Sequence, residues 1–190
     1  MRSERRGCII HKHELLKIYT ASGEPTTEFK SRGEVHKDGD WHATVHLWVI
    51  NSKNELLFQK RSESAEIYPG LWDLSAAGHV TGADSFIQSV EREALEELGL
   101  KIEGRDAQFL FTITTELHTA TLNECVYQQV YLIRHDIELN QLTLQCEEVS
   151  EVEWRHYSVL RELMIDAGVF VPRYEEYQKL LHYLEGSFIQ

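Results

Sequence analysis

The stretch GHVTGADSFIQSVEREALEELGL, residues 78 to 100, decides the fold class of this sequence. Apolar residues recur in it at helical spacing and form one arc at about 100° per residue, which predicts an amphipathic helix over residues 84 to 98. Asp84 or Ser85 can cap the start of this helix, and Gly99 can end it in the left-handed conformation. The residues of the apolar arc are Phe86, Ile87, Val90, Ala94 and Leu98.

Three glutamates lie on the same predicted helix, beside the apolar arc. Glu93, Glu96 and Glu97 stand at positions i, i+3 and i+4, so their side chains converge on one side of the helix. Like charges at this spacing destabilise a helix, and carboxylates near the core boundary lose hydration. A divalent cation such as Mg²⁺, which prefers oxygen ligands, would offset both effects. The alternative is a solvated acidic face, because most runs of glutamate are of that kind.

Alternating and apolar runs on both sides of this helix predict β-strands. In residues 41 to 50, WHATVHLWVI, the apolar residues alternate, so His42 and His46 are expected on the face that points away from the core. A turn at residues 51 to 54 leads to a second strand, ELLFQKR, which predicts a hairpin. Further strands are expected at residues 14 to 19, 109 to 115 and 125 to 133, and a second helix at residues 174 to 184. Strands on either side of a charged helix indicate a mixed α/β sandwich.

The composition is that of a globular protein with an acidic surface. Hydrophobic residues make up 42% and charged residues 26%, and the formal net charge is −12. This charge argues against binding to nucleic acid polymers or anionic membranes, and it would repel a polyanionic substrate unless cations screened the site. With 190 residues and no repeat or linker, the chain is expected to form one domain over residues 1 to 190, with residues 1 to 30 as an N-terminal extension.

The cysteines and the N-terminal segment indicate a reducing compartment. Cys8, Cys125 and Cys146 are widely spaced and form no C-x-x-C pair, so neither a disulfide framework nor a zinc knuckle is expected. No secretory segment follows the start of the sequence, and no apolar run approaches membrane-spanning length. We therefore expect a cytoplasmic protein.

The spacing within residues 78 to 100, G-x5-D-x7-R-E-A-L-E-E-L-G-L, resembles the signature box of the Nudix hydrolase family. That box reads G-x5-E-x7-R-E-U-x-E-E-x-G-U, where U is a bulky aliphatic residue. Asp84 stands where the family has its first glutamate, and Ala94 is small for its aliphatic position. The positions that match in type and spacing are Gly78, Arg92, Glu93, Glu96, Glu97, Gly99 and Leu100. The resemblance implies the Nudix-type α/β/α sandwich with a mixed sheet.

The same resemblance implies a metal-dependent site with Mg²⁺, or Mn²⁺, as the cofactor. The implied metal ligands are the Gly78 carbonyl oxygen and the side chains of Asp84, Glu93, Glu96 and Glu97. Arg92 would orient the neighbouring carboxylates through charge-assisted hydrogen bonds. In this family the base that activates water often comes from a downstream loop, for which Glu147 and Glu148 are the candidates; an ordinary exposed loop pair is the alternative.

Segments upstream of the box resemble the isopentenyl-diphosphate-isomerase-like branch of the Nudix superfamily. They are RGEVHKDGDWHATVHLWV, LLFQKRS and YPGLWDLSAAGHV, so with the box the resemblance covers about residues 30 to 100. In the true isomerases a cysteine precedes the Gly-His of the last segment, whereas this sequence has Ala77. The isomerases also have a degenerate hydrolase box, and the box here is nearly complete. Both differences favour a hydrolase over an isomerase.

The isomerase-like branch also implies a second metal site built from histidines. Its ligands would be His36, His42, His79 and Glu124. The alternative is that these histidines make structural hydrogen bonds, as a single histidine on a strand more often does. His46 carries no functional prediction. Gln59, Lys60 and Arg61, at the end of the second predicted strand, offer polar or cationic groups to a phosphate, and an exposed strand end is the alternative.

Together these patterns predict metal-dependent hydrolysis of a small organic diphosphate, either a nucleoside diphosphate derivative or an isoprenoid-type diphosphate. One alternative is an isopentenyl-diphosphate isomerase, which Ala77 disfavours. The other is a diphosphate-binding module without catalysis, and the intact carboxylates of the box argue against it. The expected partner is the small-molecule substrate, with no nucleic acid polymer and no membrane, and a homodimer is left open.

Overall fold

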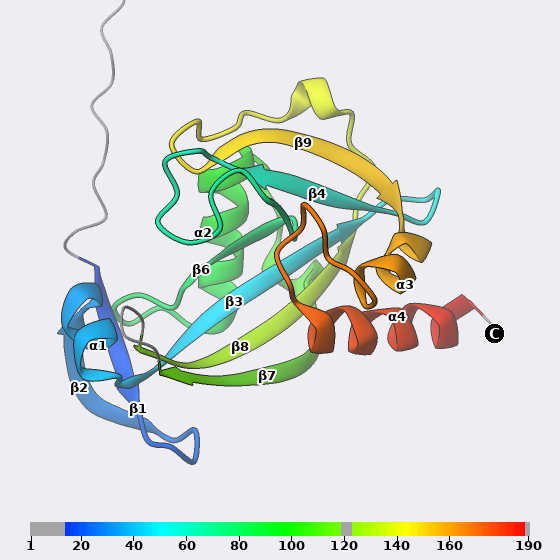
Figure 1. The fold of residues 1–190 in the computed structure, drawn as a ribbon. Helices are drawn as coiled ribbons and strands as arrows, with labels where there is room; N and C mark the ends of the chain where they lie inside the picture. Colours follow the sequence, from blue (N-terminus) through cyan, green and yellow to red (C-terminus); the bar gives the residue numbers. More distant parts are fainter. Residues whose placement is uncertain (1–13, 119–122, 189–190) are drawn as a thin grey trace, which may run out of the picture.

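The computed structural model describes residues 14 to 118 and 123 to 188 (Figure 1). In this part of the chain the strands of one mixed sheet are β1 (Leu15–Tyr19), β2 (Pro25–Ser31), β3 (Trp41–Ile50), β4 (Glu55–Arg61), β5 (Trp72–Asp73), β6 (Ala76–His79), β7 (Gln108–His118), β8 (Asn123–Arg134) and β9 (Val149–His156). The α-helices are α1 (Arg32–Asp38), α2 (Phe86–Leu98), α3 (Leu160–Leu163) and α4 (Tyr174–Phe188). Within the described ranges, none of these helices combines the length and apolar character needed to cross a membrane. Cys8 and the first residues of the expected N-terminal extension lie outside the described residues.

Strand β3 organises the sheet, because β1, β4, β6 and β8 all pair with it. It runs parallel to β8 along its whole length, from Trp41 opposite Cys125 to Ile50 opposite Arg134. Strand β6 pairs with it in the antiparallel direction. Beyond these neighbours, β7 continues the sheet next to β8, β9 and β5 pair with β4, and β2 pairs with β1. This pairing brings residues that are far apart in sequence to the middle of one mixed sheet.

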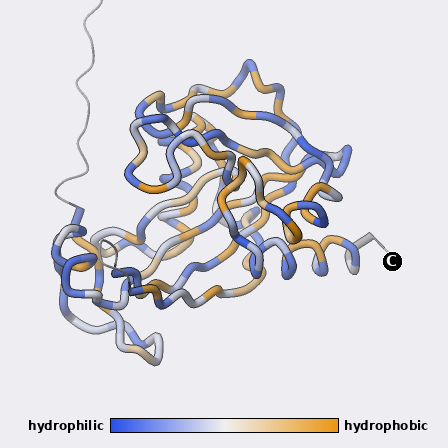
Figure 2. Tube along the Cα trace, in the orientation of Figure 1, coloured by the Kyte–Doolittle hydropathy of each residue, from blue (hydrophilic) through white to orange (hydrophobic). Residues whose placement is uncertain are grey.

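The two faces of β3 belong to two separate hydrophobic clusters. One face packs with the buried side of α2 through Ala43, Val45, Leu47 and Val49. The other packs with α3 and α4, and its residues are Trp48 and Ile50. Helices therefore cover both faces of the sheet, as the traces of α2 and α4 show in Figure 1, and hydrophobic and hydrophilic segments alternate along α4 in Figure 2. The predicted α/β/α sandwich with a mixed sheet is confirmed.

The expectation that His42 and His46 point away from the core is wrong. The exposed fraction is 0% for His42 and 3% for His46. The second face of β3 is covered by α4, whose Glu176 contacts His46 across 130 residues of sequence. Alternation within one strand cannot reveal a helix that packs on it from so far along the chain.

Helix α2 begins at Phe86 rather than at residue 84, because Ser85 is its N-cap. The Ser85 side chain accepts a hydrogen bond from the Gln88 N–H, and the Gln88 side chain accepts one from the Ser85 N–H. Gly99 ends the helix with φ at 64°, in the left-handed region, as predicted. The residues that fix the helix against the sheet are Val90, Ala94 and Leu98, all fully buried.

Helix α1 is a further element that positions the site, and the sequence patterns above do not include it. Its signal is a capping box. The Ser31 hydroxyl accepts a hydrogen bond from the Glu34 N–H at 3.4 Å, and the Glu34 carboxylate accepts one from the Ser31 N–H at 3.0 Å. The helix carries His36, and Gly39 ends it in the left-handed conformation.

Candidate active site

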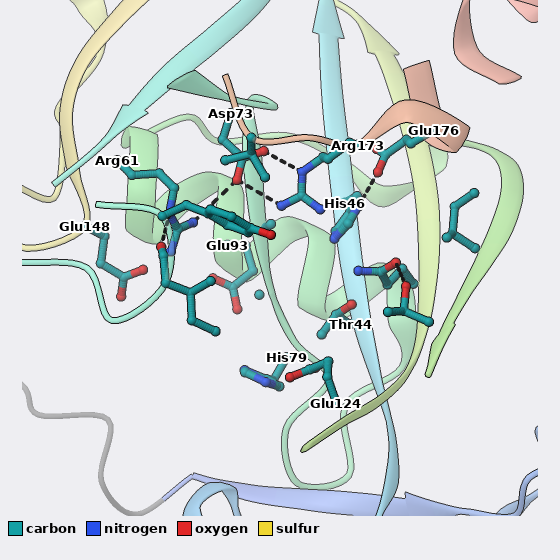
Figure 3. Close-up of a pocket in the computed structure, with 18 of the residues that line it drawn as sticks. Thr44, His46, Arg61, Asp73, His79, Glu93, Glu124, Glu148, Arg173 and Glu176 are labelled. Carbon is teal, nitrogen blue, oxygen red and sulfur yellow. Dashed lines mark hydrogen bonds and ion pairs between the residues drawn. The ribbon is translucent and has the colours of Figure 1, made fainter. Parts of the chain in front are cut away.

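A cavity of about 420 Å³ is lined by residues of α2, β3 and β6 and by the segment that leads into α4 (Figure 3). Among the described residues that line it, acidic side chains outnumber arginines. The carboxylates are those of Glu14, Asp73, Glu93, Glu97, Glu124, Glu148, Glu175 and Glu176, and the arginines are Arg32, Arg61 and Arg173. With the histidines neutral, this leaves an excess of negative charge, so an anionic substrate needs cations to enter.

Glu93 and Glu97 reach the cavity from successive turns of α2. A Cβ atom added to Gly78 of β6 would overlap the Glu93 carboxylate, so this close approach requires glycine. The Glu97 Oε2 atom accepts hydrogen bonds from Gln59 Nε2 at 3.0 Å and from the Ala77 N–H at 3.2 Å. The backbone of β6 and a side chain of β4 therefore hold the Glu97 carboxylate in place, and the Glu93 carboxylate lies close against Gly78.

Burial disfavours the ionised form of both glutamates of this pair. Burial raises the pKa of Glu93 to about 8, although the adjacent Arg92 favours the ionised form. Burial also raises the pKa of Glu97 well above its ordinary value, and the charges of Glu93 and Glu148 raise it further. The Gln59 Oε1 atom is buried without a hydrogen-bond partner in the described part of the chain. Two desolvated carboxylates that line the same cavity are oxygen ligands of the kind that suits a hard divalent cation.

Arg92 contacts several groups at the edge of this site. Its Nη1 atom lies 2.7 Å from Glu93 Oε1 and 3.1 Å from Glu96 Oε2, and its Nη2 donates to the His79 carbonyl oxygen at 2.7 Å. The Asp84 carboxylate lies 3.5 Å from Nε. Glu96 is more exposed than the other two glutamates and, like Asp84, is outside the cavity lining. Both side chains therefore contact Arg92 rather than the cavity.

The two acidic residues of the downstream loop occupy different positions. Glu148 lines the cavity. Glu147 is exposed and outside the lining, and its backbone carbonyl oxygen accepts a hydrogen bond from Ser64 Oγ at 3.3 Å. Of this pair, only Glu148 is close enough to the cavity to act on a molecule bound there.

The four residues of the implied histidine site lie together, and all of them except His42 line the cavity. The ligand atoms of His36, His42 and His79 lie within 4.8 Å of one another. Glu124 lies 3.3 Å from His42 Nε2 and 3.9 Å from His36 Nε2. Burial lowers the pKa of His36 and, more strongly, of His79. The Nε2 atoms of His36 and His42 are buried and have no hydrogen-bond partner among the described residues, so both are candidate ligand atoms for a metal ion.

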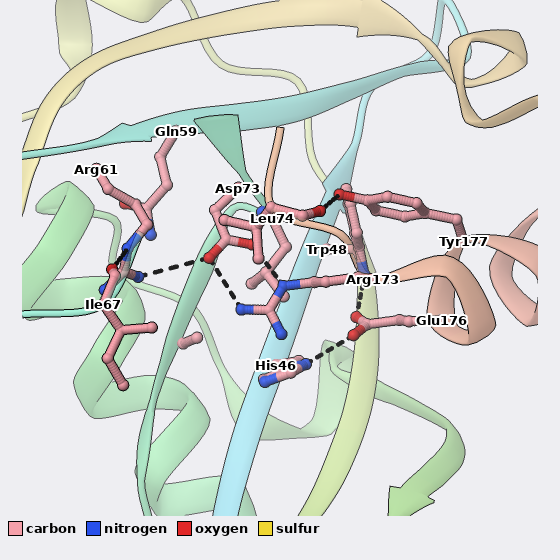
Figure 4. A network of polar contacts seen from close by, with 12 residues as sticks. His46, Trp48, Gln59, Arg61, Ile67, Asp73, Leu74, Arg173, Glu176 and Tyr177 are labelled. Atoms are coloured by element: carbon pink, nitrogen blue, oxygen red, sulfur yellow. Dashed lines mark hydrogen bonds and ion pairs between the residues drawn. The ribbon is translucent and has the colours of Figure 1, made fainter. Parts of the chain in front are cut away.

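The cavity also contains a polar network that the sequence patterns did not single out (Figure 4). His46 Nδ1 lies 2.8 Å from Glu176 Oε2, and Trp48 Nε1 donates to Glu176 Oε1 at 2.8 Å. Arg173 contacts Asp73 through two nitrogen atoms, at 2.5 and 2.9 Å. The members of each pair are at least 100 residues apart in sequence, so no local spacing could have revealed them.

Residues 40 to 174 match the family model of the NUDIX domain. The chain belongs to the Nudix family. The "Nudix hydrolase 3" of Arabidopsis thaliana is 38% identical over 164 residues, which cover 80% of this chain and 20% of the plant protein, so the chain spans about a fifth of that relative. An uncharacterized Nudix hydrolase of Listeria innocua is 36% identical over 149 residues, covering 78% of this chain and 83% of the other.

Two further comparisons bear on the branch and on the fold. The prenyl-diphosphate phosphatase of Methanosarcina mazei is 27% identical over 154 residues, which cover 77% of this Nudix chain and 83% of the phosphatase. A crystal structure of a Deinococcus radiodurans protein superposes with a TM-score of 0.69 at 21% identity, covering 87% of this chain and 98% of that one, which supports the fold alone. The family is therefore shown for this chain, and the Arabidopsis thaliana and Listeria innocua relatives are both named as hydrolases.

The surroundings of Ala77 separate this Nudix protein from the isomerases it resembles. Ala77 lines the cavity, at the position where the isomerases carry their cysteine. None of the described residues in the lining is a cysteine. Cys125, at the start of β8, is outside the lining, and its Sγ atom lies 3.8 Å from His118 Nε2. The described cavity therefore lacks the thiol of the isomerases.

Proposed function

We propose that this Nudix protein hydrolyses a small organic diphosphate with the help of Mg²⁺ or Mn²⁺ held by Glu93 and Glu97. The observation that carries the proposal is the buried pair of carboxylates with raised pKa values, in a cavity whose described lining is already acidic. The Gly78 carbonyl oxygen is a further proposed ligand. Glu96 is proposed to support the site from its edge, where Arg92 holds it beside Glu93.

The proposed chemistry assigns a role to each side chain of the cavity. When bound, the cation neutralises diphosphate oxygens and makes a water molecule more acidic. Glu148, which lines the cavity, accepts the proton of the attacking water. The water oxygen bonds to phosphorus, the bridging P–O bond breaks, and the leaving phosphate takes the electron pair. Arg92 keeps Glu93 in its orientation through their 2.7 Å contact.

Two observations favour an isoprenoid-type diphosphate over a nucleoside diphosphate derivative. The described lining includes the apolar side chains of Ile67, Ile113, Leu117 and Val171, and Tyr68 is the one tyrosine, phenylalanine or tryptophan in it that could stack on a base. A relative that covers 77% of the chain is named as a prenyl-diphosphate phosphatase.

A substrate screen tests this function. Phosphate release is measured over isoprenoid and nucleoside diphosphates, with Mg²⁺, with Mn²⁺ and with a chelator. We expect multiple turnovers on at least one short-chain isoprenoid diphosphate, only with a divalent cation. Turnover confined to nucleoside derivatives would contradict the substrate class, and no turnover on any diphosphate would contradict the function itself.

The absence of a thiol from the described lining predicts that the protein does not isomerise isopentenyl diphosphate. Incubation of isopentenyl diphosphate with the protein and Mg²⁺ should give no dimethylallyl diphosphate at a catalytic rate, as followed by chromatography of the dephosphorylated products. Isomerisation over many turnovers would show that proton transfer proceeds without a thiol beside Ala77, or through Cys125 after a rearrangement. A Cys125→Ala variant distinguishes these two cases.

The histidine cluster is proposed to hold a second divalent ion. Manganese binding followed by electron paramagnetic resonance should show two classes of site. The double change of His42→Gln and His79→Gln should remove one class, and Glu97→Gln should remove the other. Because the pKa values of His36 and His79 are lowered, their protons should displace the metal only below the ordinary imidazole range of about 6.5. If the double variant keeps both classes, the histidines are structural.

A further inference from the structure

One side of the cavity is formed by two nitrogen-rich side chains that are each fixed by a buried carboxylate. Arg173 lies just before α4 and contacts Asp73, while His46 on β3 contacts Glu176 (Figures 3 and 4). Asp73 is 1% exposed and Glu176 is 3% exposed. In Figure 3, Arg173 and His46 lie away from Glu148, and Glu93 lies between them and Glu148. Both nitrogen-rich side chains line the cavity.

Arg173 keeps hydrogen-bond donors available for a ligand. Its Nε and Nη2 atoms contact the two oxygens of Asp73 at 2.5 and 2.9 Å. A guanidinium group has five N–H donors, so after these two bonds three remain. Burial alone would raise the pKa of Asp73, but Arg173 and Arg61 hold it below its ordinary value, so it stays ionised and keeps the guanidinium in one orientation. An arginine held in this way presents a planar, charged edge to the cavity.

His46 is fixed in one tautomer by the same kind of contact. Burial alone would raise the pKa of Glu176, but His46 and Arg173 hold it below its ordinary value. An ionised carboxylate can only accept hydrogen bonds. The Nδ1 atom of His46 therefore carries a hydrogen and donates it to Glu176. The Nε2 atom is then the polar atom left to a ligand. Opposite His46 on β6 is Ala77, whose small side chain leaves room beside the ring.

We infer that Arg173 and His46 form a binding subsite for a phosphate group of the substrate. The inference rests on the proposed function and specifies where the diphosphate is held on the side away from Glu148. In a cavity whose described lining holds more carboxylates than arginines, Arg173 supplies a fixed positive charge with a geometry that matches phosphate oxygens. In the Nδ1–H tautomer the imidazole Nε2 atom accepts a hydrogen bond from a protonated oxygen of the phosphate group. Asp73 and Glu176 act as positioning residues, because they contact the two binding side chains and not the ligand.

The test uses two substitutions that keep the size of each side chain, with inorganic phosphate as the probe. Arg173→Lys keeps the positive charge and loses the planar guanidinium group, and His46→Gln loses the imidazole ring. The control is Arg105→Gln, which removes an exposed arginine on the segment after α2. In the presence of Mg²⁺, calorimetry should give a phosphate Kd about tenfold or more higher for each of the two variants than for the wild type, and an unchanged Kd for the control. The KM for the diphosphate substrate should rise in parallel, with a smaller change in kcat.

The outcomes separate this inference from the proposed function. If wild-type protein binds phosphate through Arg173 and His46 but hydrolyses no diphosphate, the subsite stands and the proposed function fails. If hydrolysis depends on Glu97 while folded Arg173→Lys and His46→Gln keep the wild-type Kd and KM, the subsite is wrong. Circular dichroism identifies a variant that does not fold. The phosphate Kd and the KM of the other variant then decide whether the subsite is correct.

Discussion

Replacing Glu97 by glutamine is expected to reduce kcat for diphosphate hydrolysis by a factor on the order of a hundred or more. Glutamine keeps the shape of the side chain, and its amide oxygen can still accept from Gln59 and from the Ala77 N–H. It loses the negative charge, however, that the proposed metal site requires. Steady-state kinetics with saturating Mg²⁺ measure the effect.

The matched control for this variant is Glu28→Gln, which removes an exposed carboxylate on β2. It should leave kcat and KM unchanged. Glu96→Gln should also lower kcat, and we expect a smaller loss than for Glu97→Gln because Glu96 contacts Arg92 outside the cavity lining. Wild-type activity in a folded Glu97→Gln variant would remove the basis of the proposed metal site.

The metal-free protein is expected to lose stability as pH rises from about 7 to about 8, and Mg²⁺ is expected to abolish this loss. Burial raises the pKa of Glu93 from an ordinary value of 4.5 to about 8 in the folded protein. Between these values the folded state holds a proton that the unfolded state has released, so the free energy of unfolding falls as pH rises. The slope is about 1 kcal/mol per pH unit for each buried glutamate that stays protonated, and Glu97 adds to it.

The buried groups with lowered pKa values do not contribute to the slope in this pH window. His36 and His79 have lowered pKa values, so they are neutral in both states above about pH 7. Asp73 and Glu176 have lowered pKa values as well, and their stabilisation is lost only in acid. Urea unfolding at several pH values, with chelator and with Mg²⁺, measures the slope. A metal-free Glu93→Gln variant should show a smaller slope, and an unchanged slope would contradict the assignment to Glu93.

The sequence alone was sufficient for the elements whose signals are local. Helix α2 carries its own start, periodicity and end within residues 78 to 100, and Ser85 and Gly99 cap it in the structure as predicted. Strand β3 is recovered with the predicted bounds of residues 41 to 50. Strands β7 and β8 are longer than predicted, because their ends pair with each other as Leu117 with Glu124 and His118 with Asn123. That pairing extends both strands beyond their apolar runs.

Features that depend on distant contacts could not be predicted. The alternation of β3 identifies two faces but not what covers the second one, and α4 covers it with Tyr177 and Leu180. For the same reason, the contact of His46 with Glu176 and that of Arg173 with Asp73 have no signature in sequence. Of the three glutamates predicted to converge from neighbouring turns of one helix, Glu93 and Glu97 line the cavity, and Glu96 is outside its described lining. The sequence could not show which of Glu147 and Glu148 lines the cavity, because that depends on how their loop folds.

The central claim is that hydrolysis depends on a divalent cation held by the buried glutamates of α2. Its most direct measurement is the initial rate of phosphate release from a short-chain isoprenoid diphosphate by chelator-treated protein, as Mg²⁺ is added back. We predict no measurable rate without the cation, a saturable recovery for wild-type protein, and a recovery in Glu97→Gln that is at least about a hundredfold lower. A full rate in the chelator-treated wild type, or equal recovery in Glu97→Gln, would contradict the claim.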